Sequence, residues 1–394
     1  MQLLIRSEAP VRCKREKGQP EEKAGRSEGK IYKKKNGREK MKRAGKIIGL
    51  VLCALALLLA AAVIYLTVRE YRPEPVEEIA ASKGKKKIGV GEEFTILSFN
   101  TGYAGLSRDE DFFMDGGKKV QPESRELVQE NLEGISRILK EQEADVYFLQ
   151  EVDRDSKRSY RIDEQAAYEA ALGYQGMYAC NFRCDFVPYP LPPIGKVESG
   201  LVTMTPYEVG QAFHIALPES FTWPVKTCNL KRCMLECRLP VEGSEKELVL
   251  INFHLEAYDS GEGKIAQSRM LAEKLKEEYE KGNYVIAGGD FNQTFEGMEK
   301  YPIHDKENWV PGVVGTDDIP EGFSYAVSDN VPTCRLLNAP YSGNYQDSQV
   351  YVIDGFILSD NVELVSVENI DTDFQYTDHQ PVRMQVRLRE KQAE

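Results

Sequence analysis

The chain has 394 residues, of which 41% are hydrophobic and 29% charged, ordinary proportions that exclude a disordered polymer and allow a sizeable core. Residues 1–46 carry 16 Lys and Arg against 6 Asp and Glu, which leaves 35 of the 51 basic and 57 of the 63 acidic residues for the remainder. An acidic body repels polyphosphate unless a basic groove or bound cations offset its charge, so binding to long nucleic-acid duplexes is disfavoured.

The N-terminal segment, residues 1–46, is rich in Lys, Glu and Gly and has almost no apolar periodicity. This composition predicts a solvated basic tail, with a basic arm for nucleic acid or lipid as the alternative. Met41 opens the segment MKRAGK, which resembles the start of a bacterial anchor, so both Met1 and Met41 stand as candidate translation starts.

Residues 47–68 contain no charged side chain. A helix of this length, at about 1.5 Å per residue, crosses a hydrocarbon core of roughly 30 Å, so the segment predicts a transmembrane helix. A cleaved secretory signal is the alternative, but Arg69 and Glu70 follow directly where a small-residue cleavage site would lie. Basic residues precede the helix, which predicts a single-pass protein of the cell membrane with a cytoplasmic N-terminus and an extracellular domain.

Residues 69–90 contain two prolines and the run KGKKK and have no hydrophobic period. They predict a linker that holds the following domain, residues 91–390, away from the bilayer. The eight cysteines of the chain are compatible with disulfides but do not demand them. Cys233 and Cys237 alternate with polar neighbours at strand period and are predicted to be buried as small apolar groups.

The body alternates short apolar runs, typical of strands, with segments of helical spacing. The predicted strands and helices are FTILSF (94–99), SRELVQENLEGISRILKEQ (124–142), DVYFLQE (145–151), ELVLINFH (247–254), IAQSRMLAEKLKEEYEKG (265–282), NYVIAGGD (283–290), QVYVIDGFILS (349–359) and PVRMQVRL (381–388). This mixture of strands and helices indicates an α/β domain. No repeat and no glycine-rich nucleotide loop is present in the sequence.

Several predicted strands end in a side chain that can bind a metal or a phosphate. These strand ends are Asn100, Glu151, His254 and Asp290. Asn292 follows Asp290 by two positions, and residues i and i+2 of an extended segment face the same side. Polar residues at strand ends of mixed α/β sheets commonly line a cleft, so we expect these residues to converge.

Six motifs carry a resemblance to a known family. They are, in order, SFN (98–100), LQEVD (149–153), NFHLEA (252–257), GGDFNQT (288–294), VIDGFILS (352–359) and TDHQPV (377–382). Their types and order resemble the endonuclease/exonuclease/phosphatase family, which includes pancreatic-type deoxyribonuclease and bacterial sphingomyelinases. The resemblance implies a metal-dependent phosphoric ester hydrolase with an α/β fold, a four-layer α-β-β-α sandwich of two packed sheets, preceded here by one transmembrane helix.

The resemblance also implies a metal site. Glu151 would bind the divalent ion, with Asn100 and Asp378 beside it. The expected ion is Mg²⁺, with Mn²⁺ and Ca²⁺ as alternatives, because hard cations take carboxylates together with water and phosphate oxygens. Asp290 and Asn292 resemble the pair that positions the attacking water and the phosphoryl oxygen.

Two histidines complete the implied catalytic set. His379 resembles the catalytic histidine and Asp354 the carboxylate that orients it, while His254 resembles a second histidine that donates to the scissile phosphate. A carboxylate partner can tune an imidazole for acid or base work near neutral pH. The sequence leaves open whether Asp290 or His379 removes the proton of the water.

Two further segments bear on the substrate. Arg158 and Tyr160 lie in SKRSYRID (156–163), where the family often contacts phosphate or leaving group; a solvated charge run is the alternative. The loop from Gly102 to Val120 departs from the family's nucleases and is expected to shape the mouth of the site.

The expected activity is hydrolysis of a phosphodiester or phosphomonoester by in-line attack of water. A tethered, acidic, outward-facing domain favours a lipid head group or a small phosphodiester as substrate. An extracellular nuclease of the same family is the first alternative, and a non-catalytic surface-binding protein on this fold is the second. Residues 47–68 would contact the membrane, nucleic acid is an unfavoured partner, and no obligate protein partner is evident.

Overall fold

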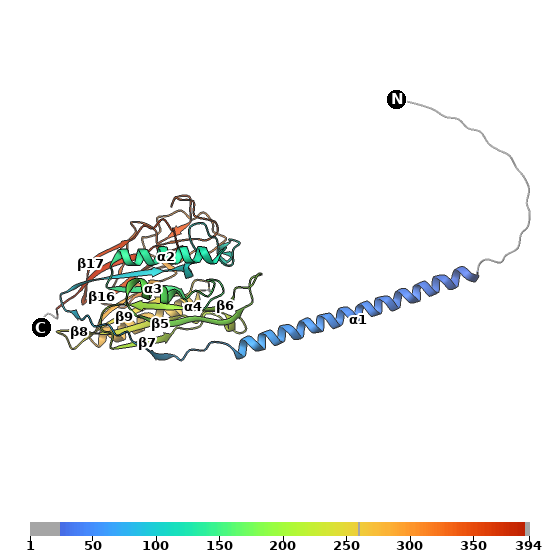
Figure 1. Ribbon diagram of the computed structural model, residues 1–394, viewed down its shortest axis with the longest axis horizontal. Helices are drawn as coiled ribbons and strands as arrows, with labels where there is room; N and C mark the ends of the chain where they lie inside the picture. Colours follow the sequence, from blue (N-terminus) through green and yellow to red (C-terminus); the bar gives the residue numbers. More distant parts are fainter. Residues whose placement is uncertain (1–23, 259–260, 391–394) are drawn as a thin grey trace, which may run out of the picture. The chain divides into compact units, whose positions relative to one another are not determined.

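The computed structural model describes residues 24–258 and 261–390 (Figure 1). The chain divides into two compact units, Met1–Ile64 and Tyr65–Glu394. Helix α1 runs from Ala24 to Val68, and its segment Tyr32–Val68 is long and apolar enough to cross a membrane. The helix begins well before the apolar stretch because Lys, Arg and Glu are good helix formers. The part of the predicted tail before Ala24 lies outside the described residues.

Two packed sheets form the centre of the second unit. One sheet has the order β17 (Val362–Asn369), β18 (Val382–Leu388), β3 (Glu93–Asn100), β4 (Val146–Asp153), β6 (Gly195–Met204), β5 (Gly176–Val187). The other has the order β1 (Val76–Ile79), β7 (Gln211–Ala216), β8 (Cys233–Glu242), β9 (Glu247–His254), β10 (Tyr284–Asp290), β16 (Asp354–Ser359), β13 (Phe323–Ala326), with β2 (Ile88–Gly89) paired to β8. Two small ribbons pair β11 (Gln293–Phe295) with β12 (Gly312–Val314) and β14 (Cys334–Arg335) with β15 (Val350–Tyr351).

The main core lies between the two sheets. Phe148 of β4 and Phe356 of β16 meet across it with ring centroids 6.3 Å apart, and Cys233 and Cys237 of β8 are buried in the same cluster. The central strands are therefore apolar on both faces, which explains their nearly continuous hydrophobic runs. The predicted burial of the two cysteines is confirmed.

Helices cover the outer face of each sheet. Helix α2 (Arg125–Gln142) and helix α3 (Glu164–Leu172) pack on the six-stranded sheet, and helix α4 (Glu262–Glu280) packs on the other. Helix α2 starts at its cap Ser124, whose hydroxyl accepts a hydrogen bond from the backbone N–H of Leu127 at 3.1 Å. The predicted four-layer α-β-β-α sandwich is confirmed.

The segment predicted as a linker, residues 69–90, contains two strands of the larger sheet. Strand β1 pairs antiparallel with β7 from Val76 opposite Ile215 to Ile79 opposite Ala212, and β2 pairs with β8. Three of the four β1 residues are exposed, as is common for an edge strand, so no hydrophobic period marks it in the sequence. This segment is therefore an edge of the larger sheet.

The strand register brings the predicted strand ends together. Parallel pairing of β9 with β10 sets His254 opposite Asp290, and antiparallel pairing of β10 with β16 sets Asp354 opposite Asp290. In the other sheet, parallel pairing of β3 with β4 sets Asn100 beside Gln150, the neighbour of Glu151. The polar ends of both sheets consequently meet at one edge of the core.

Candidate active site

Asn100 links the two sheets at this edge. Its buried Nδ2 lies 3.0 Å from Asp290 Oδ2, 3.3 Å from Glu151 Oε1 and 3.4 Å from His379 Nε2. Its Oδ1 accepts a hydrogen bond from the backbone N–H of Gly102 at 3.0 Å. One amide thus fixes the relative positions of four predicted site residues that lie up to 279 positions apart in sequence.

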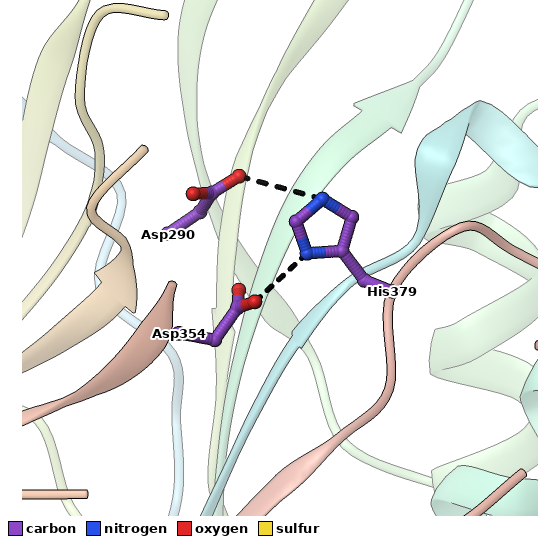
Figure 2. A group of neighbouring side chains, drawn as sticks. All are labelled: Asp290, Asp354 and His379. Atoms are coloured by element: carbon purple, nitrogen blue, oxygen red, sulfur yellow. Dashed lines mark hydrogen bonds and ion pairs between the residues drawn. The ribbon is translucent and has the colours of Figure 1, made fainter. Parts of the chain in front are cut away.

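His379 lies between two carboxylates, as Figure 2 shows. Its Nδ1 is 2.9 Å from Asp354 Oδ2, and its Nε2 is 3.6 Å from Asp290 Oδ2. A carboxylate accepts hydrogen bonds, so Nδ1 carries a proton in this pair. Burial by itself lowers the pKa of His379, but the charge of Asp354 and other nearby groups outweighs it and raises the pKa well above its ordinary value. The pair with Asp354 therefore favours the protonated ring.

His254 faces the same carboxylate in the opposite protonation state. Its Nε2 lies 3.4 Å from Asp290 Oδ2, and its buried Nδ1 has no hydrogen-bond partner among the described residues. Burial, followed by the positive charge of Arg232, lowers the pKa of His254 well below its ordinary value. The two imidazoles about this carboxylate therefore have pKa values shifted in opposite directions.

These side chains open into a cleft of about 330 Å³. Its lining includes the predicted residues Glu151, Arg158, His254, Asp290, Asn292, Asp378 and His379. Asp354 and Asn100 lie behind the lining and hold residues that form it. Residues of the loop from Gly102 to Val120, among them Phe112 and Met114, also line the cleft, so the expectation that this loop shapes the mouth is confirmed.

A solved structure shares the fold of this chain. The endonuclease/exonuclease/phosphatase of Beutenbergia cavernae DSM 12333 aligns over 75% of this chain and 72% of its own, with a TM-score of 0.53 and 18% identity. The chain has the endonuclease/exonuclease/phosphatase fold. At this identity the likeness establishes the fold alone.

Two other structures are similar to a lesser degree. The endonuclease/exonuclease/phosphatase of Bacteroides vulgatus covers 75% of this chain and 99% of its own, at 15% identity and a TM-score of 0.48. Truncated TDP2 of Caenorhabditis elegans covers 75% and 98%, at 15% identity and a TM-score of 0.46. No family model and no curated protein matches the chain.

The divalent metal that this fold implies fits the acidic residues of the cleft. Burial raises the pKa of Asp378 to about 7, an effect that His379 opposes and Glu151 enlarges. Burial and then the charge of Asp354 raise the pKa of Asp290 to about 6. A bound cation stabilises the ionised form of carboxylates that lie close together and are buried away from water. Glu151 and Asp378 could hold such an ion.

A second group of side chains could also hold a metal. Ligand atoms of Asp290, Asp354 and His379 lie within 4.8 Å of one another (Figure 2). His379 Nδ1 donates to Asp354 at 2.9 Å, so only Nε2 of this ring could ligate an ion there. The same hydrogen bond accounts for the closeness of His379 and Asp354, whereas Glu151 and Asp378 offer the carboxylate oxygens that a hard divalent cation prefers.

Asn292 and Arg158 line the cleft in constrained positions. Asn292 Nδ2 donates to the backbone carbonyl of Leu255 at 2.9 Å, which fixes the amide and leaves its second N–H for a ligand. Arg158 donates from two nitrogens to Asp153 at 3.0 and 2.9 Å and stacks 3.7 Å from the ring centroid of Tyr103. Arg158 is therefore a fixed positive charge and not a solvated run.

Tyr160 lies away from the cleft. Its hydroxyl donates to the backbone carbonyl of Pro122 at 2.9 Å, and its ring packs against the core beneath α2 and α3. Tyr160 is not among the residues that line the cleft, so its predicted contact with the substrate stays a prediction. Its position close to Arg158 in sequence gave no information on which side of the chain each residue faces.

Arg232 lines the cleft without having been assigned a role from sequence. It is 5% exposed at the start of β8, and its Nε lies 3.7 Å from Glu256 Oε2. Its Nε and Nη1 make no hydrogen bond within the described part of the chain. Buried donors without partners are costly, and a guanidinium in a cleft is suited to an anionic ligand. The sequence signal is the basic pair Lys231–Arg232 directly before a strand.

Proposed function

We propose that the protein is a membrane-anchored, divalent-metal-dependent phosphoesterase. The observation that carries this proposal is the convergence of the His379–Asp354 pair, the carboxylate of Asp290 and two Arg232 nitrogens that make no hydrogen bond within the described residues in one cleft. The helix ending at Val68 would anchor the domain outside the cell, as the basic residues before it predict.

In the proposed reaction, water attacks the phosphorus atom and one P–O ester bond breaks. Asp290 accepts the proton of the water, because its pKa of about 6 leaves it ionised near neutral pH. His379 is already protonated, so it donates to an oxygen of the phosphate as negative charge develops there. A bound divalent cation, held by Glu151 with Asn100 and Asp378 beside it, would supply further charge stabilisation.

Three other groups would bind the phosphoryl oxygens. Arg232 offers the two guanidinium nitrogens that lack partners. Asn292 offers its second amide hydrogen, and neutral His254 offers a ring N–H. These neutral and positive donors could bind the negatively charged phosphate in a domain that is otherwise acidic.

A lipid head group or a small phosphodiester is the proposed substrate, and an extracellular nuclease of the same fold is the alternative. The test is a panel assay of the full-length protein in detergent, with sphingomyelin, phosphoinositides, duplex DNA and RNA, each with and without Mg²⁺. We expect hydrolysis of a lipid or small diester that EDTA abolishes. Hydrolysis of DNA or RNA alone would establish the nuclease instead.

The variant Asp290→Asn separates an enzyme from a binding protein on the same fold. It keeps the shape of the side chain but cannot accept the proton, so turnover should fall about 10²- to 10⁴-fold. The control is His304→Ala, which removes an exposed histidine outside the cleft and should leave turnover unchanged. If the parent hydrolyses nothing in the panel, the surface-binding alternative replaces the enzyme.

Orientation is tested separately by adding protease to intact cells. The domain after residue 69 should be digested, because the proposed topology places it outside. Digestion that requires permeabilised cells would reverse the orientation.

A further inference from the structure

One wall of the cleft is apolar. The side chains Phe113, Val187, Tyr189, Ile194, Phe221 and Val225 line it, and they come from the loop before α2, the turn between β5 and β6, and the segment before β8. A phosphate with a small polar alcohol would gain nothing from such a wall. Burial of apolar surface is favourable at about 25 cal/mol per Å², so the wall is suited to a ligand with an apolar part.

The same segments carry apolar side chains on the outer surface of the domain. Leu191 is 88% exposed and Trp223 is 58% exposed, and Phe186, five positions before Leu191, is 46% exposed. Two wall residues, Tyr189 and Val225, are themselves more than half exposed. Exposed apolar groups gathered at the mouth of a cleft mark a surface that contacts another apolar phase.

The last residues of the apolar helix, which belong to the second unit, attach at this surface. Leu66 packs in one cluster with Phe182 and Val187, and Thr67 Oγ1 accepts a hydrogen bond from Trp223 Nε1 at 3.0 Å. Arg69, the first charged residue after the helix, pairs with Asp185 of β5 at 2.7 Å. The apolar surface therefore lies where the chain leaves a membrane span, and Trp is enriched at that depth.

We propose that the substrate is a bilayer phosphoester with a long apolar chain, which enters the cleft directly from the membrane that holds the anchor. This inference rests on the proposed phosphoesterase function. The phosphate would lie at Arg232 and His379, and the first carbons of the chain along the apolar wall. A cleft of about 330 Å³ holds a head group and a short length of chain, so the remainder stays in the bilayer. Water adds to phosphorus and gives its proton to Asp290, a P–O ester bond breaks, and the leaving alkoxide takes that proton to become the free alcohol.

The first test uses alkyl p-nitrophenyl phosphate diesters with chains of two, four, six and eight carbons, each below its aggregation concentration. If the wall binds the chain, kcat/KM should rise about fourfold for each methylene until the wall is filled. Hydrolysis with no dependence on chain length would overturn the inference and leave the proposed function intact. No hydrolysis of any diester would overturn the proposed function itself.

The second test compares variants of the full-length protein in phosphatidylcholine vesicles that contain a long-chain diester. Val225→Asp, in the wall, should flatten the rise with chain length. Leu191→Ser, on the outer surface, should lower the vesicle rate several-fold relative to the rate on the short diester. The matched control Leu364→Ser removes an apolar side chain that is 40% exposed on β17 and does not line the cleft, and it should leave this ratio unchanged. Equal ratios for Leu191→Ser and Leu364→Ser would overturn entry from the bilayer.

Discussion

Two clusters of buried charged side chains in the second unit differ in how completely they are paired. In the first, Arg238 of β8 contacts Glu236 at 2.7 Å, Glu247 at 2.7 Å and Glu278 at 2.9 Å. Lys274 pairs with Glu236 and Glu278, each at 2.9 Å. Each charge in this cluster has an opposite charge beside it, so the cluster ties α4 to the sheet and has no need of a ligand.

The second cluster is the cleft, where several polar atoms are buried without partners. Within the described part of the chain, these include two nitrogens of Arg232 and Nδ1 of His254. A buried donor without a partner costs about 1–3 kcal/mol, which a purely structural cluster would not retain. In the first cluster, carboxylates lie 2.7 to 2.9 Å from Arg238, whereas in the cleft Arg232 and His254 keep nitrogens that a ligand could bind.

The strongest test of that difference is His379→Ala. The substitution removes the imidazole that would donate to the phosphate, so kcat should fall about 10²- to 10⁴-fold. It also leaves the buried carboxylate of Asp354 without this partner, which should lower the free energy of unfolding by about 1–3 kcal/mol. Turnover of a soluble phosphodiester and urea unfolding would be measured on the same preparation. Asp354→Asn should act in the same direction more weakly, because the ring remains but loses its orienting carboxylate. Wild-type turnover in both variants would mean that His379 and Asp354 form a structural ion pair with no role in turnover.

Glu151→Gln should have the next largest effect and a different signature. The amide keeps the shape of the side chain but removes the charge that holds the cation, so activity should fall steeply and excess Mg²⁺ should restore part of it. Added Mg²⁺ should restore nothing in His379→Ala. Isothermal titration with Mn²⁺ would locate the ion directly: weaker binding in Asp354→Asn than in Glu151→Gln would place it at the other acidic group.

The pH dependence of kcat/KM offers a smaller effect with a definite sign. A base acts in its deprotonated form, so the rate should rise with pH and level off above the pKa of Asp290, about 6 at low metal concentration. Raising Mg²⁺ should move this midpoint to lower pH, because a cation stabilises the carboxylate. A midpoint that moves to higher pH with Mg²⁺ would exclude Asp290 as the base.

The convergence of the site residues was easier to predict from the sequence than the structure of residues 69–90. Asn100, Glu151, His254 and Asp290 end strands, and strand pairing must bring such ends together, so local pattern sufficed. The position of Tyr160 outside the cleft lining could not be predicted because side-chain direction in an irregular turn depends on tertiary packing. Strand β1 was missed because an exposed edge strand shows no alternation of apolar and polar residues. The role of Arg232 could not be predicted because it depends on which of its nitrogens are left without a hydrogen bond in the folded domain.

The smallest expected effect belongs to the paired cluster, through Glu278→Gln. The loss of a charged hydrogen-bond acceptor should lower the free energy of unfolding by about 2 kcal/mol and leave turnover unchanged. The matched control on the same helix is Glu280→Gln, whose side chain is 65% exposed and which should change the stability by a few tenths of a kcal/mol at most. If Glu278→Gln lost turnover while remaining folded, the Arg238 cluster would be needed for the function of the cleft.

The pH dependence of this stability loss has a definite sign. Burial raises the pKa of Glu278, but hydrogen bonds from Arg238 and from two lysines outweigh it, so the pKa in the folded protein lies below its ordinary value of 4.5. The carboxylate therefore contributes its full stability above about pH 4.5, and the contribution is lost as the pH falls towards the folded pKa. Urea unfolding at pH 7 and at pH 3 should thus show a difference between wild type and Glu278→Gln that shrinks at the lower pH. A difference that grows on acidification would mean that the carboxyl is bound in its neutral form, and the cluster would then not be a paired ionic one.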